Sequence, residues 1–310
     1  MGRFASQHAG SSTLSVGKPS PQSAAPEWLV QAWHSAGTCP GASCCPMGPG
    51  FPYLAAGTPF LPSCMIDLQN VYLAFGELKV LDGLSLNLEA GGRMCIVGKS
   101  GTGKSVLMKV MTGLLKPQRG EVFLDGARVT NYTEAEWCEV RHNFGMVFQN
   151  AALLDSLTVE ENVGIRLLEE HRHSRKLIRD RVVEELERVG LDAEVLPKLP
   201  NQLSGGMRKR VAIARAIIHR PRFLFYDEPT AGLDPQNSNV VDDLIESLSQ
   251  TEPDITSVII THDLDSVKRL GDRVLMLNAG RIAYWGDGTG FWTDDEPVVQ
   301  AFLARYHERV

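Results

Sequence analysis

The run Gly98–Ser105 carries the clearest chemistry in this sequence. It reads G-K-S-G-T-G-K-S and matches the pattern G-x-x-x-x-G-K-[ST]. The apolar residues Met94–Val97 precede it, and the helical pattern Val106–Met111 follows it. Glycines let successive backbone N–H groups converge on phosphate oxygens, and the N-terminus of the helix adds positive potential. The run therefore predicts a loop that binds the phosphates of a nucleotide, rather than a glycine-rich turn without a ligand.

The residues of this loop have different expected tasks. Lys104 is placed to reach the β and γ phosphate oxygens, and the Ser105 hydroxyl to ligate Mg²⁺. The other residues expected to contact the nucleotide are Gly98, Lys99, Ser100, Gly101, Thr102 and Gly103.

Two adjacent carboxylates, Asp227 and Glu228, end the apolar run Phe223–Tyr226. We expect Asp227 to hold Mg²⁺ through its water shell and Glu228 to polarise an attacking water. The alternative is that this acidic pair caps a helix. His262 follows another apolar run and should emerge at the same sheet edge, where ligands of open α/β sheets bind. A single histidine is more often structural, but this position favours sensing of the γ-phosphate.

The composition argues against two other classes of protein. The 310 residues carry a formal net charge of −6, which gives no basic field of the kind that nucleic-acid binders use. The longest stretch without Asp, Glu, Lys or Arg, Trp28–Ile66, contains six prolines, which would break a membrane-spanning helix. The six cysteines lack the spacing of a zinc site or a disulfide framework, so we interpret them as reduced thiols.

Residues 1–64 are rich in Gly, Ser, Pro and Ala and carry few charges, which predicts a disordered segment. A strand-like pattern begins at Met65, so the upstream part could instead be a mis-annotated extension. Two further interpretations stay open. Met1–Ser6 fits an N-myristoylation pattern, and the first 26 residues resemble a transit peptide.

From Met65 onward, apolar strand runs alternate with helical patterns, which is typical of a mostly parallel α/β protein. Gln149 to Leu203 contains no apolar strand run and predicts a helical insertion. The predicted strands are Arg93–Val97, Gly145–Phe148, Phe223–Tyr226, Ser257–Ile260 and Arg273–Leu277. The predicted helices are Gly103–Thr112, Arg175–Val189, Gly205–His219, Pro235–Leu248, Leu264–Leu270 and Val298–Arg309.

The segment Leu203–Met207, followed by R-K-R-V-A-I-A-R-A, resembles the signature of ABC ATPases. The resemblance extends from Met65 to about Leu277, with the family's other elements in order. Gln149 corresponds to the Q-loop, Ala231–Asp234 to the D-loop and His262 to the switch histidine. The resemblance implies an α/β fold of the P-loop NTPase type, with a RecA-like core, an antiparallel β subdomain and a helical signature subdomain. Residues 65–290 would form this ATPase domain, with the helical part at about 150–205 and a helical tail at 291–310.

The resemblance also implies an ATP-hydrolysing enzyme that uses ATP and Mg²⁺ and works as a dimer. Ser204, Gly205 and Gly206 form a second anion-binding turn at a helix N-terminus, and in the family this turn faces the phosphate loop of a second copy packed head to tail. Gln149 and Asp234 would also contact nucleotide, and Gln149 the metal. Phe75 stands where the family places an aromatic ring against adenine. Alternatively, Phe75 is a core residue of a β-hairpin, and Tyr72 stacks instead.

Met207 stands where many ABC ATPases have glutamine. Together with the sequence around Gln149, it resembles the Mla-type ATPases that move phospholipids or other hydrophobic molecules. This implies a separate membrane permease, a membrane-anchored MCE-domain protein, no nucleic acid, and a peripheral location on the cytoplasmic face of the cell membrane. Residues Ala151–Val163 are the candidate docking surface for the permease, unless they form a solvated helix face.

Three other functions compete with this one. An importer ATPase for polar solutes such as amino acids would carry the same motifs. A non-transport ABC protein would usually have two cassettes or a large coiled-coil insertion, and neither is seen. A small-molecule kinase would use the phosphate loop but has no use for Leu203–Met207.

Overall fold

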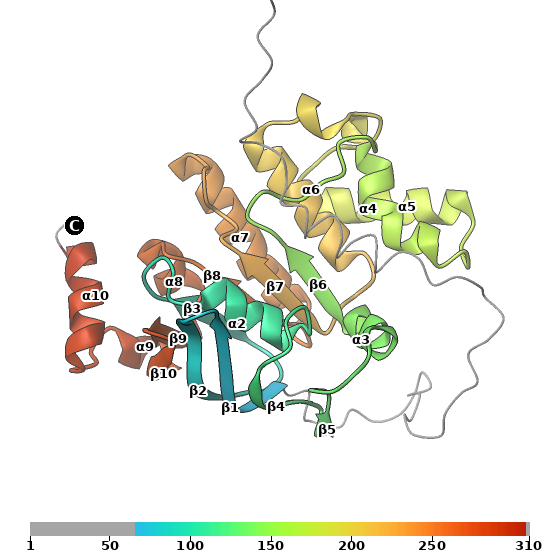
Figure 1. Ribbon diagram of the computed structural model, residues 1–310. Helices are drawn as coiled ribbons and strands as arrows, with labels where there is room; N and C mark the ends of the chain where they lie inside the picture. The colour runs from blue at the N-terminus through green and yellow to red at the C-terminus, as the bar shows by residue number, and fades with distance from the viewer. Residues whose placement is uncertain (1–65, 308–310) are drawn as a thin grey trace, which may run out of the picture. The chain divides into compact units, whose positions relative to one another are not determined.

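The computed structural model describes residues 66–307 (Figure 1). The predictions for residues 1–64, and for Met65 as a start, lie outside the described residues. Within the described part, no helix is long and apolar enough to cross a bilayer.

A six-stranded sheet in the order β10-β9-β3-β8-β7-β6 forms the centre of the fold. All neighbouring strands pair in parallel except β10, which joins the edge antiparallel to β9. The five predicted strands are confirmed to within one residue at each end, whereas β10 was not predicted. The strands are β3 (Arg93–Val97), β6 (Phe144–Val147), β7 (Phe223–Asp227), β8 (Thr256–Ile260), β9 (Arg273–Asn278) and β10 (Arg281–Asp287).

The central strands are apolar along their whole length because both faces of the sheet are covered. Successive residues point to opposite faces: Leu224 and Tyr226 of β7 join one buried cluster, and Phe223 and Phe225 join the other. Such a strand shows no alternation of apolar and polar residues in its sequence, because the side chains on both faces are buried.

A second, antiparallel sheet has the order β2-β1-β4-β5, as the family resemblance implied. Its two longest strands largely alternate buried and exposed residues, with the apolar face turned to the core shared with α2 (Lys104–Met111). Gly76, with φ 59°, occupies the turn between the first two strands, which a residue without Cβ adopts readily. The strands are β1 (Ile66–Phe75), β2 (Leu78–Leu88), β4 (Arg119–Leu124) and β5 (Ala127–Arg128).

The helices predicted beside the core sheet are confirmed, with small differences at their ends. Helix α6 (Gly205–Ile217) stops two residues early, because Pro221 disfavours a helical conformation at Arg220, whose φ is 54°. Helix α7 (Pro235–Thr251) continues three residues further, to just before Pro253. Helix α8 (Leu264–Leu270) has the predicted bounds, and α10 (Pro297–His307) lies where the C-terminal helix was predicted. The short helices α3 (Glu134–Val140) and α9 (Gly288–Phe291) were not predicted.

Two helices form the predicted helical insertion. Helices α4 (Val159–Glu169) and α5 (Arg175–Arg188) pack on each other and on α6 (Figure 1). Thr158 and Glu161 form a capping box that fixes the start of α4. As predicted, there is no strand between Gln149 and Leu203 in the described chain.

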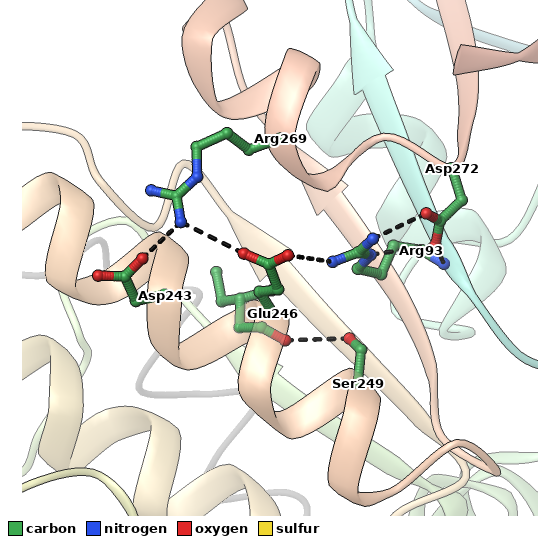
Figure 2. A network of polar contacts seen from close by, with 7 residues as sticks. Arg93, Asp243, Glu246, Ser249, Arg269 and Asp272 are labelled. Atoms are coloured by element: carbon green, nitrogen blue, oxygen red, sulfur yellow. Dashed lines mark hydrogen bonds and ion pairs between the residues drawn. The ribbon is translucent and has the colours of Figure 1, made fainter. Parts of the chain in front are cut away.

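A chain of charged side chains joins α7, α8 and the start of β3 (Figure 2). Arg269 on α8 contacts Asp243 and Glu246 of α7. Glu246 also lies 4.0 Å from Arg93, whose guanidinium donates two hydrogen bonds to Asp272. These contacts fix the two helices whose N-terminal ends follow Asp234 and His262.

Candidate nucleotide-binding site

A cavity of about 1240 Å³ opens at the carboxyl end of the central strands. The strands β3, β7 and β8 all end beside it, which is where ligands of open α/β sheets bind. The predicted site residues that line this cavity are Phe75, Gly98, Lys99, Ser100, Gly101, Gly103, Lys104, Ser105, Gln149, Asp227, Glu228 and His262.

The loop Gly98–Ser105 curls around the start of α2. Gly98, Gly101 and Gly103 have φ angles of 143°, 81° and 102°, which residues with a Cβ rarely adopt. A Cβ on Gly98 would come within 2.4 Å of the Leu277 carbonyl oxygen. The glycine is therefore required by a close approach to β9 as well as by its backbone conformation.

The Lys104 ammonium lies inside this loop and donates to the carbonyl oxygens of Gly98 at 2.9 Å and Lys99 at 3.1 Å. Only 8% of Lys104 is exposed. Burial lowers its pKa, while the nearby carboxylates of Glu228 and Asp227 act in the opposite direction. The cation thus sits where nucleotide phosphates would replace the two carbonyls as its partners.

Ser105 and Asp227 meet across the cavity, with Ser105 Oγ donating to Asp227 Oδ1 at 3.2 Å. Burial raises the pKa of Asp227, and this hydrogen bond and Lys109 oppose the effect. A hydroxyl and a carboxylate oxygen in contact are the hard donors that Mg²⁺ uses together with phosphate and water. The residues present therefore fit Mg²⁺ as part of a nucleotide complex.

Glu228 follows β7 with φ 50°, a left-handed conformation that is uncommon for a residue with a long side chain. Its N–H donates to the Ile260 carbonyl of β8 at 2.9 Å. Its Oε2 lies 2.7 Å from Nδ1 of His262. The side chain of Glu228 is 14% exposed and that of His262 is 69% exposed. Glu228 and Asp227 both line the cavity.

Of the two aromatic candidates for a base-stacking role, only Phe75 lines the cavity. It lies at the end of β1 and is 52% exposed. The ring of Tyr72 instead lies near Gly83 on β2. Phe75 is thus not a core residue of the hairpin, and an exposed ring at a polar cavity can offer a face to a base.

Five predicted residues within the described chain do not line the cavity, namely Thr102, Ser204, Gly205, Gly206 and Asp234. Ser204 caps α6 by accepting from the Met207 N–H at 3.2 Å. Asp234 caps α7, and both of its carboxylate oxygens accept from Asn237. A Cβ on Gly206 would come within 2.6 Å of the Asn237 side chain. The signature turn therefore packs against the D-loop and the start of α7. Ala231–Leu233 of the D-loop line the cavity, whereas Ser204–Gly206 lie outside it.

Two buried charged residues beside the site, Lys209 on α6 and Asp242 on α7, were missed by the sequence analysis. Lys209 is 4% exposed, and burial lowers its pKa to about 8. The available signal was helical spacing, because Lys209 stands three residues after Gly206 and four before Ile213, on a buried stripe. Asp242 lines the cavity and accepts a hydrogen bond from Ser266 of α8 at 2.7 Å.

Comparisons with known proteins agree with this geometry. A family model described as "ABC transporter" matches residues 81–231. The chain is 42% identical over 254 residues to the Arabidopsis thaliana protein Trigalactosyldiacylglycerol 3, chloroplastic, covering 77% of this chain and 73% of that one. It is 35% identical over 238 residues to the probable ribonucleotide transport ATP-binding protein mkl of Mycobacterium leprae, covering 77% and 68%.

A solved structure with similar geometry is a dimeric ATP-binding cassette in a post-hydrolysis state, bound to ADP and Pi. The two share 32% sequence identity and a TM-score of 0.66, over 72% of this chain and 98% of that chain. The strand ends, the phosphate loop and the carboxylate pair described above thus occur on a fold that has been observed with nucleotide.

Proposed function

From the premise that this chain belongs to the ABC transporter family and is an ATPase, we propose that it powers transport of a phospholipid or another hydrophobic substrate through a separate permease. The observation that supports the ATPase site most directly is the meeting of Lys104, Asp227 and Glu228 in one cavity. A phosphate-binding cation, a metal-binding carboxylate and a general base are the parts that phosphoryl transfer to water needs.

In the proposed mechanism, the loop Gly98–Ser105 holds the ATP phosphates through its backbone N–H groups and Lys104. Lys104 leaves the carbonyls of Gly98 and Lys99 and turns to the β and γ phosphates. Ser105, Asp227 and Gln149 would hold Mg²⁺. The metal supplies charge stabilisation to the phosphates when it is bound. Phe75 stacks on the face of the base and so orients the nucleotide, without hydrogen bonds to the edge of the base.

Glu228 is proposed as the residue that orients and polarises the attacking water. Its carboxylate is held by His262, and its backbone is held by the N–H bond to the Ile260 carbonyl. His262 reaches the γ-phosphate from its exposed face and reports the presence of that phosphate to α8. Removal of a general base usually costs about 10² to 10⁴ in rate.

A second copy of this chain is proposed to complete the site. Ser204, Gly205 and Gly206 lie outside the cavity of their own chain, so their anion-binding turn is available to the phosphates of a partner. Two copies packed head to tail would place each signature turn over the other copy's loop, and Asp234 at the same interface. The similarity to a cassette solved as a dimer supports this arrangement.

The segment Ala151–Val163 remains the proposed docking surface for the permease. Ala151 and Ala152 have φ angles of 60° and 47°, so the chain bends sharply after Gln149. Leu154 then presents a large apolar side chain that is 37% exposed. An exposed apolar group beside a nucleotide-contacting loop suits a surface that transmits closure of the dimer to a membrane partner.

The lipid substrate and the membrane-anchored MCE-domain partner rest on relatives and on Met207. One relative is named for trigalactosyldiacylglycerol, a galactolipid, which favours an amphipathic lipid. Another is named as a probable ribonucleotide transport protein, which favours the polar-solute alternative. Both substrates would be handled by other chains, because the cavity is lined by the charged groups Lys104, Asp227 and Glu228 and would hold the nucleotide.

A peripheral membrane location follows from the proposed permease. We place the protein on the cytoplasmic face of the cell membrane, as the Mla-type resemblance implies. The name of the Arabidopsis relative instead favours an organelle and the transit-peptide interpretation of the N-terminal segment. Fusion of residues 1–64 to a fluorescent protein distinguishes these locations, since only a transit peptide would carry the reporter into a plastid.

The substrate is tested with the full-length chain assembled with its co-purifying permease in liposomes. We expect ATP to drive transfer of a fluorescent phospholipid, and the Glu228→Gln variant to abolish that transfer. ATP-driven movement of a radiolabelled nucleotide or amino acid, without movement of lipid, would contradict the proposal.

A further inference from the structure

Lys209 joins three separate parts of the site through one ammonium group. Its Nζ lies 2.5 Å from the carbonyl oxygen of Gln149 and 3.2 Å from the carbonyl oxygen of Glu228. Gln149 follows β6 and Glu228 follows β7, and these two strands are neighbours in the central sheet. Lys209 itself belongs to the first turns of the signature helix α6.

The two carbonyls need a partner because both lie at irregular backbone. Glu228 has a left-handed φ of 50°, and such conformations persist only where the surroundings hold them. An ammonium that donates to the Glu228 carbonyl restrains the peptide that carries the catalytic carboxylate. The same ammonium restrains Gln149, so the two residues cannot shift independently.

A second buried cation on the same helix acts further along the same loop. Arg215, 6% exposed, donates to the carbonyl oxygens of Ala152 at 2.6 Å and Ala151 at 2.8 Å. These are the two consecutive residues with left-handed φ angles after Gln149. Helix α6 therefore holds the loop at both ends, by Lys209 near the site and by Arg215 two turns further.

Burial of the Lys209 ammonium is energetically unfavourable. Its desolvation costs free energy that an apolar side chain of similar length would not incur. The hydrogen bonds of Lys209 run to carbonyls. Among residues 66–307 no carboxylate forms a salt bridge with it, although Asp227 and Glu228 attract it from a distance. What the charge provides is a fixed position of Gln149 and Glu228 relative to α6.

The geometry points to Lys209 as a positioning residue that links the signature turn to the catalytic Glu228 of the same chain. This inference rests on the proposed head-to-tail dimer and on the proposed role of Glu228. In that dimer, Ser204–Gly206 contacts the nucleotide bound by the partner, whereas Glu228 acts on the nucleotide bound by its own chain. Lys209, one helical turn after Gly205, is then a physical connection between the two ATP sites.

The first test separates positioning from ATP binding in the full-length protein. Lys209→Met should lower kcat by about tenfold or more, since small displacements of catalytic groups are costly, while the Kd for fluorescent ATP changes little. Lys209→Arg, which keeps the cation, should recover most of the rate. Arg210→Met is the matched control, because Arg210 donates to the carbonyls of Val189 and Gly190, away from the site.

Unchanged kcat in Lys209→Met, or an equal loss in Arg210→Met, would overturn the inference. If Lys209→Met does not fold, Lys209→Gln serves in its place. Gln lacks the charge and is one atom shorter, so the same split between kcat and Kd is expected. A failure of Lys209→Arg to recover any rate would also count against it, since that variant preserves the donor.

The second test uses mixed dimers in which one subunit carries Glu228→Gln, so that only one site turns over. That site combines the partner's Glu228 with the signature turn of the Glu228→Gln subunit. Lys209→Met should lower its rate when placed in either subunit. If Lys209→Met lowers the rate in only one of the two subunits, Lys209 acts on a single ATP site, and the proposed connection between the two sites is overturned. Full turnover by a dimer with Glu228→Gln in both subunits would instead overturn the proposed function itself.

Discussion

His262 Nδ1 lies 2.7 Å from Glu228 Oε2, although the two residues follow different strands, β8 and β7. The contact pairs a largely exposed imidazole with a largely buried carboxylate. Glu228 is thereby fixed at its carboxylate by His262, at its N–H by Ile260 and at its carbonyl by Lys209. A catalytic group held at three points is pre-organised for its reaction.

Replacement of Glu228 by Gln should lower ATP turnover by about 10² or more, because an amide cannot accept the proton of the attacking water. ATP binding should be retained, because Lys104 and the loop are unchanged, and the closed dimer should accumulate. Phosphate release and gel filtration with ATP measure the two effects. Turnover near the parent rate would refute the catalytic role.

Replacement of His262 by Ala should lower kcat by about 10- to 100-fold and change ATP affinity less, because the contact with Glu228 is lost while the phosphate loop stays intact. Steady-state kinetics and equilibrium binding of fluorescent ATP separate the two parameters. His219→Ala serves as control, since its Nε2 contacts the Phe144 carbonyl away from the cavity. Equal losses of kcat in both variants would indicate a general structural effect.

Asp242 should make the stability of the fold depend on pH. Burial raises its pKa from 3.8 to about 6, and Asp263 and Asp243 add to this, whereas Ser266 and Arg269 oppose it. The folded chain therefore binds this proton more tightly than the unfolded chain. Its stabilising contribution is complete below pH 4 and is lost as the pH rises through about 6.

Asp242→Asn should consequently stabilise the protein at pH 8 by about 3 kcal/mol, because a pKa raised from 3.8 to about 6 gives that value at about 1.4 kcal/mol per pKa unit. The substitution should have little effect at pH 4. Urea unfolding at both pH values measures this difference. The control is Asp254→Asn, at an exposed position. An equal effect of Asp242→Asn at both pH values would exclude linkage to this carboxyl group.

Arg93→Lys should lower the free energy of unfolding by about 1 kcal/mol, because lysine cannot reproduce the paired hydrogen bonds to Asp272. The Arg93 side chain is only 15% exposed. Arg128 also makes two bonds to Glu121 but is 54% exposed. Arg128→Lys should therefore cost less than about 0.5 kcal/mol. Similar losses in both variants by urea unfolding would contradict this dependence on burial.

A chain shortened to begin at Met65 should retain ATP hydrolysis, because the phosphate loop, the carboxylate pair and the signature all lie downstream. The comparison is made between full-length and shortened protein by steady-state phosphate release. A large loss of kcat in the shortened protein would assign residues 1–64 a part in hydrolysis.

The elements that carry the site could be predicted from the sequence to within a few residues. Strand β7 ends at Asp227, and α2 begins directly after a glycine-rich loop. Both boundaries are marked by residues adjacent in the sequence, so they could be recognised without the tertiary structure. Two misses have a local explanation. Strand β10 is half-buried along its length, and α3 has seven residues and depends on its capping box, so their apolar patterns are weak.

The sequence by itself determined which residues could do chemistry, because the phosphate loop, the Asp227–Glu228 pair and the signature turn are short motifs whose function depends on adjacent residues. Only the tertiary structure decided which groups meet. The contact of His262 with Glu228 spans 34 residues, and that of Lys209 with Gln149 spans 60. Such contacts depend on the order of strands in the sheet and on which face a helix buries. The role of Lys209 depends on its contacts with two backbone carbonyl oxygens. Because every residue has such a carbonyl, the sequence contains no signal for which two Lys209 contacts.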